Sequence, residues 1–262
     1  MKITIIGGGN MGGAIARGLS QGSICQPSDI TVIDLNQNVL NELKTFNKEI
    51  HAIEKDDAAI QSADIIVVAL KPWLMKGVLE QISRLIDSGR QSIVSIAAGI
   101  TFAQMKEYLN LKSEPALFRI IPNTAISIGE SMTFISSNHA SAEQEKQIAD
   151  IFNSMGSIQL VDEKYMAAGT ALASCGIAYA FRYIRAATEA GVEIGFYPNQ
   201  AKEIVIQTLK GAISLLEATG NHPEQEIDKV TTPGGITIKG LNTLEKNGFT
   251  HAVIEGIKAG NV

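Results

Sequence analysis

The chain has 262 residues, of which 45% are hydrophobic and 19% are charged, so it is long enough for one large or two modest domains. A formal net charge of −5 without a Lys/Arg cluster excludes a nucleic-acid footprint, and two cysteines, Cys25 and Cys175, cannot make a disulfide framework. The longest apolar stretch, 167–181, is too short for a membrane span and no signal-type leader is visible, so we expect a cytoplasmic protein without a membrane partner.

The N-terminal segment reads as a strand, a glycine-rich loop and a helix in direct succession. A strand over Lys2–Ile6 is followed by the loop and by a helical pattern over Ala14–Gln21. In this order the first glycine permits a tight turn, the second lets a pyrophosphate approach the backbone, and the third lets helix and strand pack closely. The alternative interpretation is a glycine-rich turn that binds no ligand. We predict a dinucleotide site that contains Gly7, Gly8, Gly9, Asn10, Met11 and Gly12.

Strand and helix patterns then alternate, which favours a Rossmann-type, doubly wound parallel sheet over residues 1–161. Apolar runs such as Ile65–Ala69 lack a polar face, as expected of a central parallel strand. Thr101 with Gln104, and Ser141 with Gln144, have capping-box spacing at two helix starts. The further predicted strands are Ile30–Asp34, Ser92–Ile96, Leu117–Ile121, Met132–Ser136 and Ser157–Leu160, and the further helices are Val39–Phe46, Trp73–Leu85 and Phe102–Leu109.

Asp34 stands where the second predicted strand ends, which places a carboxylate near the ribose of a bound adenosine. There it can accept hydrogen bonds from the 2′-OH and repel a 2′-phosphate. Lys and Arg are absent from residues 34–42. Asp34 therefore favours NADH, with NADPH possible, and a helix-capping aspartate is the alternative interpretation.

Three later segments follow predicted strands and so belong to the ligand edge of the sheet. Ala69, Leu70, Lys71 and Pro72 would lie along the cofactor, although a solvated lysine at a strand end is an equal alternative for Lys71. Small residues over 95–99 leave room for a nicotinamide ring. In the segment 119–124, Asn123 either donates to a ligand or caps a turn.

After Val161 strand signals disappear and helical patterns predict an all-α domain over residues 162–262. The segment 166–187 is apolar or small nearly all round, as in a helix at the centre of a bundle or against a second copy. The predicted helices are Glu163–Ala190, Pro198–Thr219, Pro233–Lys246 and Thr250–Ala259.

The segment 231–237, Thr-Thr-Pro-Gly-Gly-Ile-Thr, is the second informative motif. Thr232 suits a helix N-cap and Pro233 the first helical position. Two glycines in that first turn weaken a helix by roughly 1 kcal/mol each, so we expect bare amides there to bind a carboxylate. The alternative interpretation is a weakened helix start that binds no ligand.

Residues typical of a general base or a metal site are missing from the informative motifs. The four histidines fall in poorly patterned stretches, and no cysteine or carboxylate constellation suggests a metal. Oxidation of an alcohol normally requires a proton acceptor, whereas reduction of a protonated imine does not. The pattern therefore fits imine reduction better.

With these motifs in hand, the chain resembles the Δ1-pyrroline-5-carboxylate reductase family along its whole length. The resemblance depends on the glycine loop, on 69–72, on 119–124, on 190–192 and above all on 228–238 with Leu241, Leu244 and Glu245. It implies an NAD(P)H-dependent reduction of 1-pyrroline-5-carboxylate, a cyclic imino acid, to L-proline, the last step of proline biosynthesis.

The resemblance also implies site residues and an assembly. Thr232, Gly234, Gly235 and Thr237 would bind the substrate carboxylate, with Thr237 in the catalytic role near the imine nitrogen. The helical domain would form a homodimer, and larger assemblies of dimers occur in the family.

One segment departs from the family pattern, and two other functions remain as alternatives. Where the family has Ser-Gly-Ser-Gly-Pro-Ala-Tyr, this chain has Ala173-Ser-Cys-Gly-Ile-Ala-Tyr179, and loss of the proline predicts a more regular helix. A β-hydroxyacid dehydrogenase would need Lys and Asn four positions apart on a C-terminal helix, a spacing found only at Lys106 and Asn110 in the first domain. A non-catalytic dinucleotide-binding dimer is the other alternative.

Overall fold

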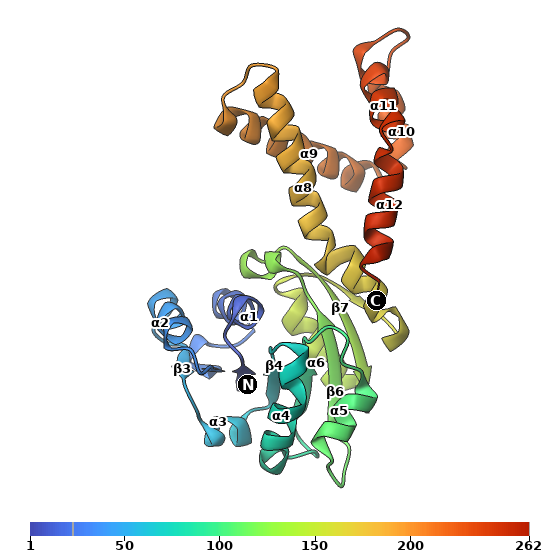
Figure 1. Ribbon diagram of the computed structural model, residues 1–262. Coiled ribbons are helices and arrows are strands. Elements are labelled where there is room, and N and C mark those ends of the chain that lie inside the picture. Colours follow the sequence, from blue (N-terminus) through green and yellow to red (C-terminus); the bar gives the residue numbers. More distant parts are fainter. Residues whose placement is uncertain (23, 262) are drawn as a thin grey trace. The chain divides into compact units, whose positions relative to one another are not determined.

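The computed structural model describes residues 1–22 and 24–261, which form two compact units (Figure 1). The first unit holds Met1–Cys175 with the residues after Ala259, and the second holds Gly176–Ala259. The domain boundary expected between residues 161 and 162 stays a prediction.

Eight strands among the described residues form one sheet in the order β3-β2-β1-β4-β5-β6-β7-β8. Neighbours from β3 to β6 run parallel, β7 runs antiparallel to β6, and β8 runs parallel to β7. The chain order reverses between β1 and β4, the switch point of a doubly wound sheet, so the predicted fold class is confirmed. The strands are β1 (Ile3–Ile6), β2 (Ile30–Ile33), β3 (His51–Ile53), β4 (Ile65–Val68), β5 (Ser92–Ser95), β6 (Ala116–Ile121), β7 (Ser131–Asn138) and β8 (Gly156–Leu160).

Helices cover both faces of this sheet and bury a separate apolar cluster on each. One cluster joins the sheet to α1, α2 and α6, and the other joins it to α3, α4 and α5. Burial on both faces explains why β1 and β4 consist of residues that are buried throughout. These helices are α1 (Asn10–Gln21), α2 (Gln37–Phe46), α3 (Asp57–Ser62), α4 (Pro72–Ile82), α5 (Phe102–Leu109) and α6 (Ala142–Asn153).

Short turns complete the first unit, and both predicted capping boxes are confirmed. Thr101 accepts from the amide of Gln104 at 3.2 Å while the Gln104 side chain accepts from the amide of Thr101 at 2.9 Å, and Ser141 with Gln144 repeats the pattern. The short elements are the 3₁₀ turns η1 (Pro27–Asp29), η2 (Ser83–Leu85), η3 (Thr124–Ile128) and η4 (Glu163–Tyr165), the helix α7 (Met166–Gly169) and the π-helical turn η5 (Thr170–Ser174).

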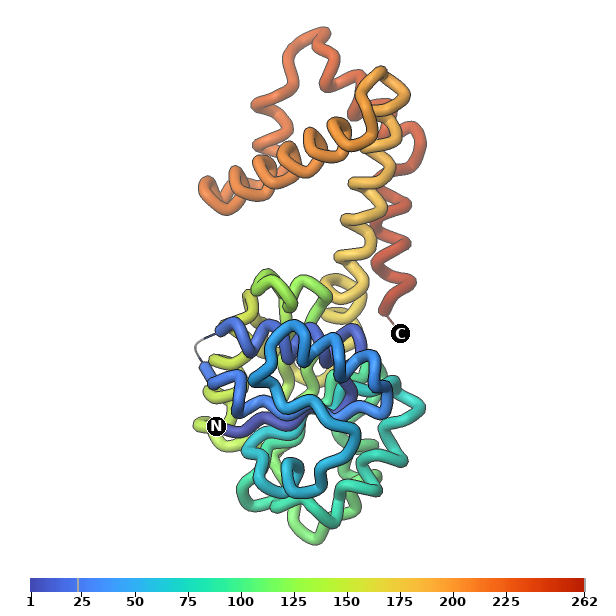
Figure 2. The backbone as a smooth tube through the Cα atoms, turned by 90° about the vertical axis from the view of Figure 1, so that its left-hand side faces the viewer, coloured from blue at the N-terminus to red at the C-terminus, as the bar shows by residue number. Residues whose placement is uncertain are grey.

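The second unit contains α8 (Gly176–Glu193), α9 (Pro198–Thr219), α10 (Pro223–Val230), α11 (Ile236–Lys246) and α12 (Phe249–Ala259). Helices α8 and α9 pack closely, since a Cβ on Gly191 would lie 2.8 Å from that of Ala201. The Tyr179 hydroxyl donates to the carbonyl of Gly256 at 3.2 Å, and the rings of Tyr183 and Phe249 meet edge to face at 6.4 Å. These contacts hold α12 beside α8 (Figure 2).

The second unit does not bury a core of its own. Ala201 is the one buried hydrophobic residue among its described positions, whereas large apolar side chains along α8, α9 and α12 are exposed. An exposed apolar surface of this extent marks an interaction site. Helices of the described residues are too short or too polar to cross a membrane.

Candidate functional site

The glycine loop between β1 and α1 has a separate steric reason for each of its spaced glycines. Gly7 has a positive φ of 98°, and a Cβ there would lie 2.6 Å from the carbonyl oxygen of Ala69. A Cβ on Gly12 would collide with the carbonyl of Gly7, so α1 can approach the loop only without a side chain there. A Cβ on Gly9 would instead point into open space. The absent side chain at Gly9 therefore leaves room for a ligand at the start of α1.

The start of α1 presents free backbone amides to that space. Gly9 is the N-cap of α1 and makes no side-chain capping bond, and the first turn holds no acidic residue. Unpaired amides and the helix dipole make such a start a binding site for phosphate. The observed geometry thus fits the pyrophosphate of a dinucleotide.

Asp34 follows β2 and ties the glycine loop to the next turn. One carboxylate oxygen accepts from the amide of Gly8 at 2.7 Å, and the other accepts from the amide of Asn36 at 2.8 Å. Each carboxylate oxygen has a second acceptor site, so the side chain can still accept from hydroxyl groups of a ligand. Its helix-capping role is small, because Asn36 is the residue that caps α2.

A cavity of about 600 Å³ lies at the carboxyl ends of β1, β4, β5 and β6, and we call it the sheet-edge cavity. Its walls are the glycine loop with Asp34, the residues 69–72 and 74, the ends of β5 and β6 (96–98 and 121–122), and two residues of η5, Thr170 and Ser174. All of the predicted cofactor residues except Gly8 and Gly12 line it. Those two lie buried beneath the loop and shape it.

A second cavity, of about 440 Å³, adjoins the first and is called here the β2–α4 cavity. The two share Gly7, Asp34, Leu70 and Leu74 as lining residues. Glu54 and Asp56 add carboxylates to its wall, while Lys55 and Arg84 add cations. Asp34 therefore lies where the two cavities meet, as expected for a carboxylate that faces the ribose between an adenine and a pyrophosphate.

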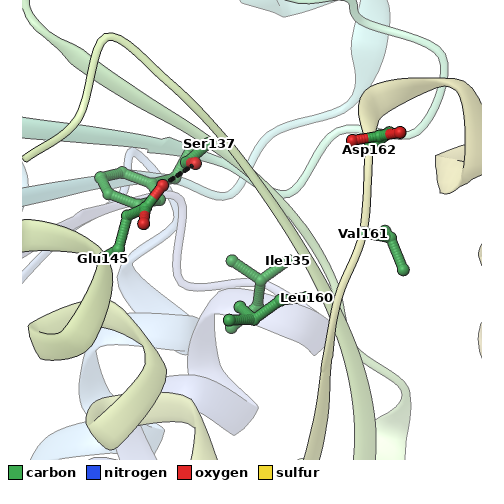
Figure 3. A pocket seen from close by; sticks show the side chains of 7 residues that line it. Ile135, Ser137, Glu145, Leu160, Val161 and Asp162 are labelled. Carbon is green, nitrogen blue, oxygen red and sulfur yellow. Dashed lines mark hydrogen bonds between the residues drawn. The ribbon is translucent and has the colours of Figure 1, made fainter. Parts of the chain in front are cut away.

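A third cavity, of about 260 Å³, lies elsewhere in the first unit (Figure 3). Phe118, Ile135 and Leu160 line it, and the carboxylate of Glu145 accepts from the hydroxyl of Ser137. Phe118 is nearer the amino end of β6, whereas Ile121 at the carboxyl end lines the sheet-edge cavity. This third cavity is thus separate from the ligand edge of the sheet.

The turn η5 corrects the expectation of a more regular helix around Ala173–Ile177. The amide of Cys175 donates to the carbonyl of Thr170 at 2.8 Å, five residues back, so the segment is π-helical. Just before it, Gly169 lies against the ring of Phe134, where a Cβ would come within 2.7 Å. Loss of a proline therefore did not make this helix regular. Single π turns are frequent at functional sites.

Asn123 and Arg119 do not line the sheet-edge cavity. The Asn123 side chain accepts from the amide of Ala125 at 3.0 Å and caps η3, which confirms the turn interpretation. Arg119 is buried and donates to Glu163 at 2.8 Å, and the same carboxylate oxygen accepts from the amide of Phe102 at 2.7 Å. Both residues serve the structure of the first unit.

The second motif, at 231–237, begins its helix later than predicted. Gly235, not Thr232, is the N-cap, and α11 starts at Ile236. The amide of Gly235 donates to the carbonyl of Thr232 at 2.9 Å, with Pro233 and Gly234 (φ 73°) between them, as in a type II turn. The glycines therefore precede the helix, and their cost to helix stability does not arise. The helix start still lacks a side-chain cap and an acidic residue.

Sequence reasoning missed several residues of the two cavities. Thr170 and Ser174 line the sheet-edge cavity, and residues 54–57, 78 and 84 line the β2–α4 cavity. Ile96–Ala98 and Pro122 directly follow strands, and this position predicts that they lie at the cavity. Thr170 and Ser174 lie more than 40 residues beyond β6 along the chain, so their position in the sequence does not predict a place at the cavity.

Other chemistries find little support in the described residues. No cluster of three or more potential ligands that could hold a metal ion occurs in residues 1–22 and 24–261. Lys106, required by the hydroxyacid dehydrogenase alternative, lies on α5 and pairs with Glu114 at 2.7 Å. Neither Lys106 nor Asn110 lines the sheet-edge cavity.

Two family models match this chain. Residues 163–261 match the model for pyrroline-5-carboxylate reductase dimerisation. Residues 2–99 match a model described as NADP oxidoreductase, coenzyme F420-dependent.

Similar proteins match nearly the whole chain. Pyrroline-5-carboxylate reductase 2 of Dictyostelium discoideum is 37% identical over 270 residues, which cover 98% of this chain and 89% of that protein. Pyrroline-5-carboxylate reductase of Glycine max is 31% identical over 256 residues, which cover 97% of this chain and 91% of that protein. A crystal structure of Plasmodium falciparum pyrroline carboxylate reductase with NADP bound is 30% identical, with a TM-score of 0.90 and 99% and 95% covered. The sheet, the glycine loop and these relatives together establish that the chain belongs to the pyrroline-5-carboxylate reductase family.

Proposed function

We propose that the protein reduces 1-pyrroline-5-carboxylate to L-proline with a reduced nicotinamide dinucleotide, the last step of proline biosynthesis. The observation that carries the proposal is a glycine loop with free helix amides that opens into the sheet-edge cavity, in a chain of this family. A bound reduced nicotinamide supplies a hydride to the C=N carbon. The chain also belongs in the cytoplasm on this proposal.

The cavity residues bind and orient the cofactor. The backbone amides at the start of α1 would hold the pyrophosphate, and residues 69–72 would lie along the cofactor. The small side chains of Ala97 and Ala98 would leave space for a flat ring. Positioning the two reactants in contact contributes much of the rate in such a reaction.

We further propose that NADH is preferred over NADPH. The Asp34 carboxylate lies between the two cavities, held by the amides of Gly8 and Asn36. A 2′-phosphate placed there would face a negative charge at hydrogen-bond distance, while a 2′-OH would find an acceptor. NADPH stays possible, since Lys55 and Arg84 line the neighbouring cavity.

The start of α11 is the proposed site for the substrate carboxylate. Gly234 and Gly235 leave the backbone bare, and the hydroxyls of Thr232 and Thr237 flank it. All four residues lie in the second unit; Gly235 is half-buried and the other three are exposed. A carboxylate at a helix start gains from the dipole and from unpaired amides. Thr237 is the proposed catalytic residue, with its hydroxyl near the imine nitrogen.

The protein is proposed to act as a homodimer formed by the helices of the second unit. Residues 163–261 match a family dimerisation model. The exposed apolar faces of α8, α9 and α12 would be buried against a second copy of the chain. Larger assemblies of dimers are compatible with this arrangement.

A spectrophotometric assay tests the reaction. The purified chain is mixed with 1-pyrroline-5-carboxylate and either NADH or NADPH, and loss of reduced nicotinamide is followed. We expect turnover with both and a higher kcat/KM with NADH. Turnover with hydroxyacids alone, or dinucleotide binding without turnover of the imino acid, would contradict the proposal.

A further inference from the structure

The two ends of the sheet-edge cavity differ in their polar groups. At the glycine-loop end the lining side chains include Asn10, Asp34 and Lys71. At the end formed by β5 and β6 the lining residues 96–98 and 121–122 have no polar side chains. The turn η5 packs against β7, the neighbour of β6, so in the described part of the chain the polar side chains nearest this end are those of Thr170 and Ser174.

These two hydroxyl groups are not equivalent. The Thr170 hydroxyl donates to the carbonyl of Met166 at 2.7 Å, four residues back in the helix. For Ser174 the carbonyl four residues back is that of Thr170, which already accepts from the amide of Cys175. Within residues 1–22 and 24–261 the Ser174 hydroxyl forms no hydrogen bond, although it lines the cavity. The π turn therefore presents an unused hydroxyl to the cavity.

The sequence departure described above coincides with this turn. By the family resemblance, the pattern Ser-Gly-Ser-Gly has glycine where this chain has Ser174. A serine on a helix commonly bonds back to the preceding turn, as Ser20 and Ser154 do on α1 and at the end of α6. Ser174 does not.

We infer that Ser174 contacts the cofactor, with its hydroxyl hydrogen-bonded to the carboxamide of the nicotinamide ring. The inference rests on the proposed function. Nicotinamide is a flat ring with one polar substituent, and this end of the cavity offers apolar walls, with small side chains at Ala97 and Ala98, and one free hydroxyl. A hydroxyl can donate to the carboxamide oxygen or accept from its nitrogen. The bond restrains rotation of the ring and so helps to select the face from which hydride leaves.

Titration calorimetry with NADH and with ADP-ribose tests this contact, because ADP-ribose lacks the nicotinamide. For Ser174→Ala we expect the Kd of NADH to rise about fivefold, the effect of one lost hydrogen bond. The Kd of ADP-ribose should stay within about twofold, which also shows that the variant is folded. Ser174→Thr, which keeps a hydroxyl, should bind NADH as the wild type does. Ser154→Ala, which removes a hydroxyl already bonded to the carbonyl of Ile151 and outside both cavities, should leave NADH binding unchanged.

Several results would overturn the inference. Equal weakening of NADH and ADP-ribose would make Ser174 a structural residue of the turn. If Ser174→Ala bound NADH as tightly as the wild type, whether or not its KM for the imino acid rose, Ser174 would not contact the nicotinamide. If the wild-type chain bound ADP-ribose but reduced no imino acid with NADH, the proposed function itself would fail, whereas the Ser174→Ala comparison would still report on the contact.

Discussion

Asp34 has a structural role in the glycine loop and a proposed role in cofactor selection. Its carboxylate fixes the amides of Gly8 and Asn36, and it stands where the two cavities meet. On the proposed cofactor preference Asp34 would repel a 2′-phosphate, and it also holds the glycine loop through the amide of Gly8. Changes of cofactor preference at this position should therefore reduce affinity for both dinucleotides.

Asp34→Ser should shift the preference toward NADPH. We expect the ratio of kcat/KM for NADPH to that for NADH to rise roughly tenfold or more, because a charge-assisted acceptor for the ribose is lost and repulsion of a phosphate ends. NADH should also bind less tightly. Steady-state kinetics with both dinucleotides measure the ratio. Asp57→Asn, which alters a carboxylate of the β2–α4 cavity outside the shared wall, is the control and should change the ratio less than about twofold.

Thr237 tests the proposed substrate site. Thr237→Val should lower kcat/KM for the imino acid about tenfold, because it removes the hydroxyl proposed to lie near the imine nitrogen, while the Kd of NADH stays unchanged. Thr243→Val on the same helix is the control, since its hydroxyl is already bonded to the carbonyl of Lys239 at 2.8 Å. An equal loss of NADH binding and turnover would contradict the role given to Thr237.

At the scale of elements, Arg119 connects three segments of the first unit. It lies on β6, its partner Glu163 lies on η4, and the Glu163 carboxylate also accepts from the first amide of α5. The Arg119 side chain is 8% exposed and that of Glu163 is 37% exposed. Nε of Arg119 is buried and without a partner among the described residues, so this guanidinium depends on Glu163 for its charge pairing.

Glu163→Ala should therefore destabilise the protein by about 3 kcal/mol, because it leaves a buried arginine unpaired. Urea denaturation followed by circular dichroism measures the change in the free energy of unfolding. Lys146→Ala, which breaks the exposed pair with Asp150 on α6, serves for comparison and should cost no more than about 0.5 kcal/mol. A similar small value for both variants would show that the Arg119 pair does not stabilise the fold.

The alternation of strands and helices could be predicted because its cause is local. A run such as Ile65–Val68 must be buried on both faces, and Gly7 and Gly12 of the first loop each avoid a steric clash that the structure shows. The predicted cofactor residues follow strands, and parallel strands bring their carboxyl ends to one edge. Most of that site could therefore be named from its positions along the chain.

Other elements were missed because tertiary contacts decide them. The strand β3 has three residues with an exposed His51 at its start, too short for a periodic pattern. Helix α10 is rich in charged residues and is capped by His222, an uncommon capping residue. The π turn η5 depends on how the chain packs beside β7, which spacing along the sequence does not reveal. Ser174 was missed for that reason.

At the scale of the whole molecule, the second unit determines the assembly. With Ala201 as its one buried hydrophobic residue among those described, this unit gains little free energy from its own packing. A second copy packed against the apolar faces of α8, α9 and α12 would bury these side chains and so stabilise the unit. The stability of the protein should then depend on its concentration.

Ile213→Asp should weaken the homodimer. Ile213 lies on α9 and is 57% exposed in the single chain, and a charge there would oppose burial against a partner. We expect the dimer dissociation constant from analytical ultracentrifugation to rise at least tenfold. Gln207→Asp, about 120° round the same helix, is the matched control and should leave the dimer intact. A monomeric wild-type protein at micromolar concentration would contradict the proposed assembly.

Trp73 stands between Pro72 and Leu74, which line the sheet-edge cavity, and its side chain is 76% exposed. It is also the single tryptophan of the chain. Indole fluorescence overlaps the absorption of dihydronicotinamide, so bound NADH should quench this emission by energy transfer while NAD⁺ should not. With that quenching, Trp73 would report the redox state of the bound cofactor without any label.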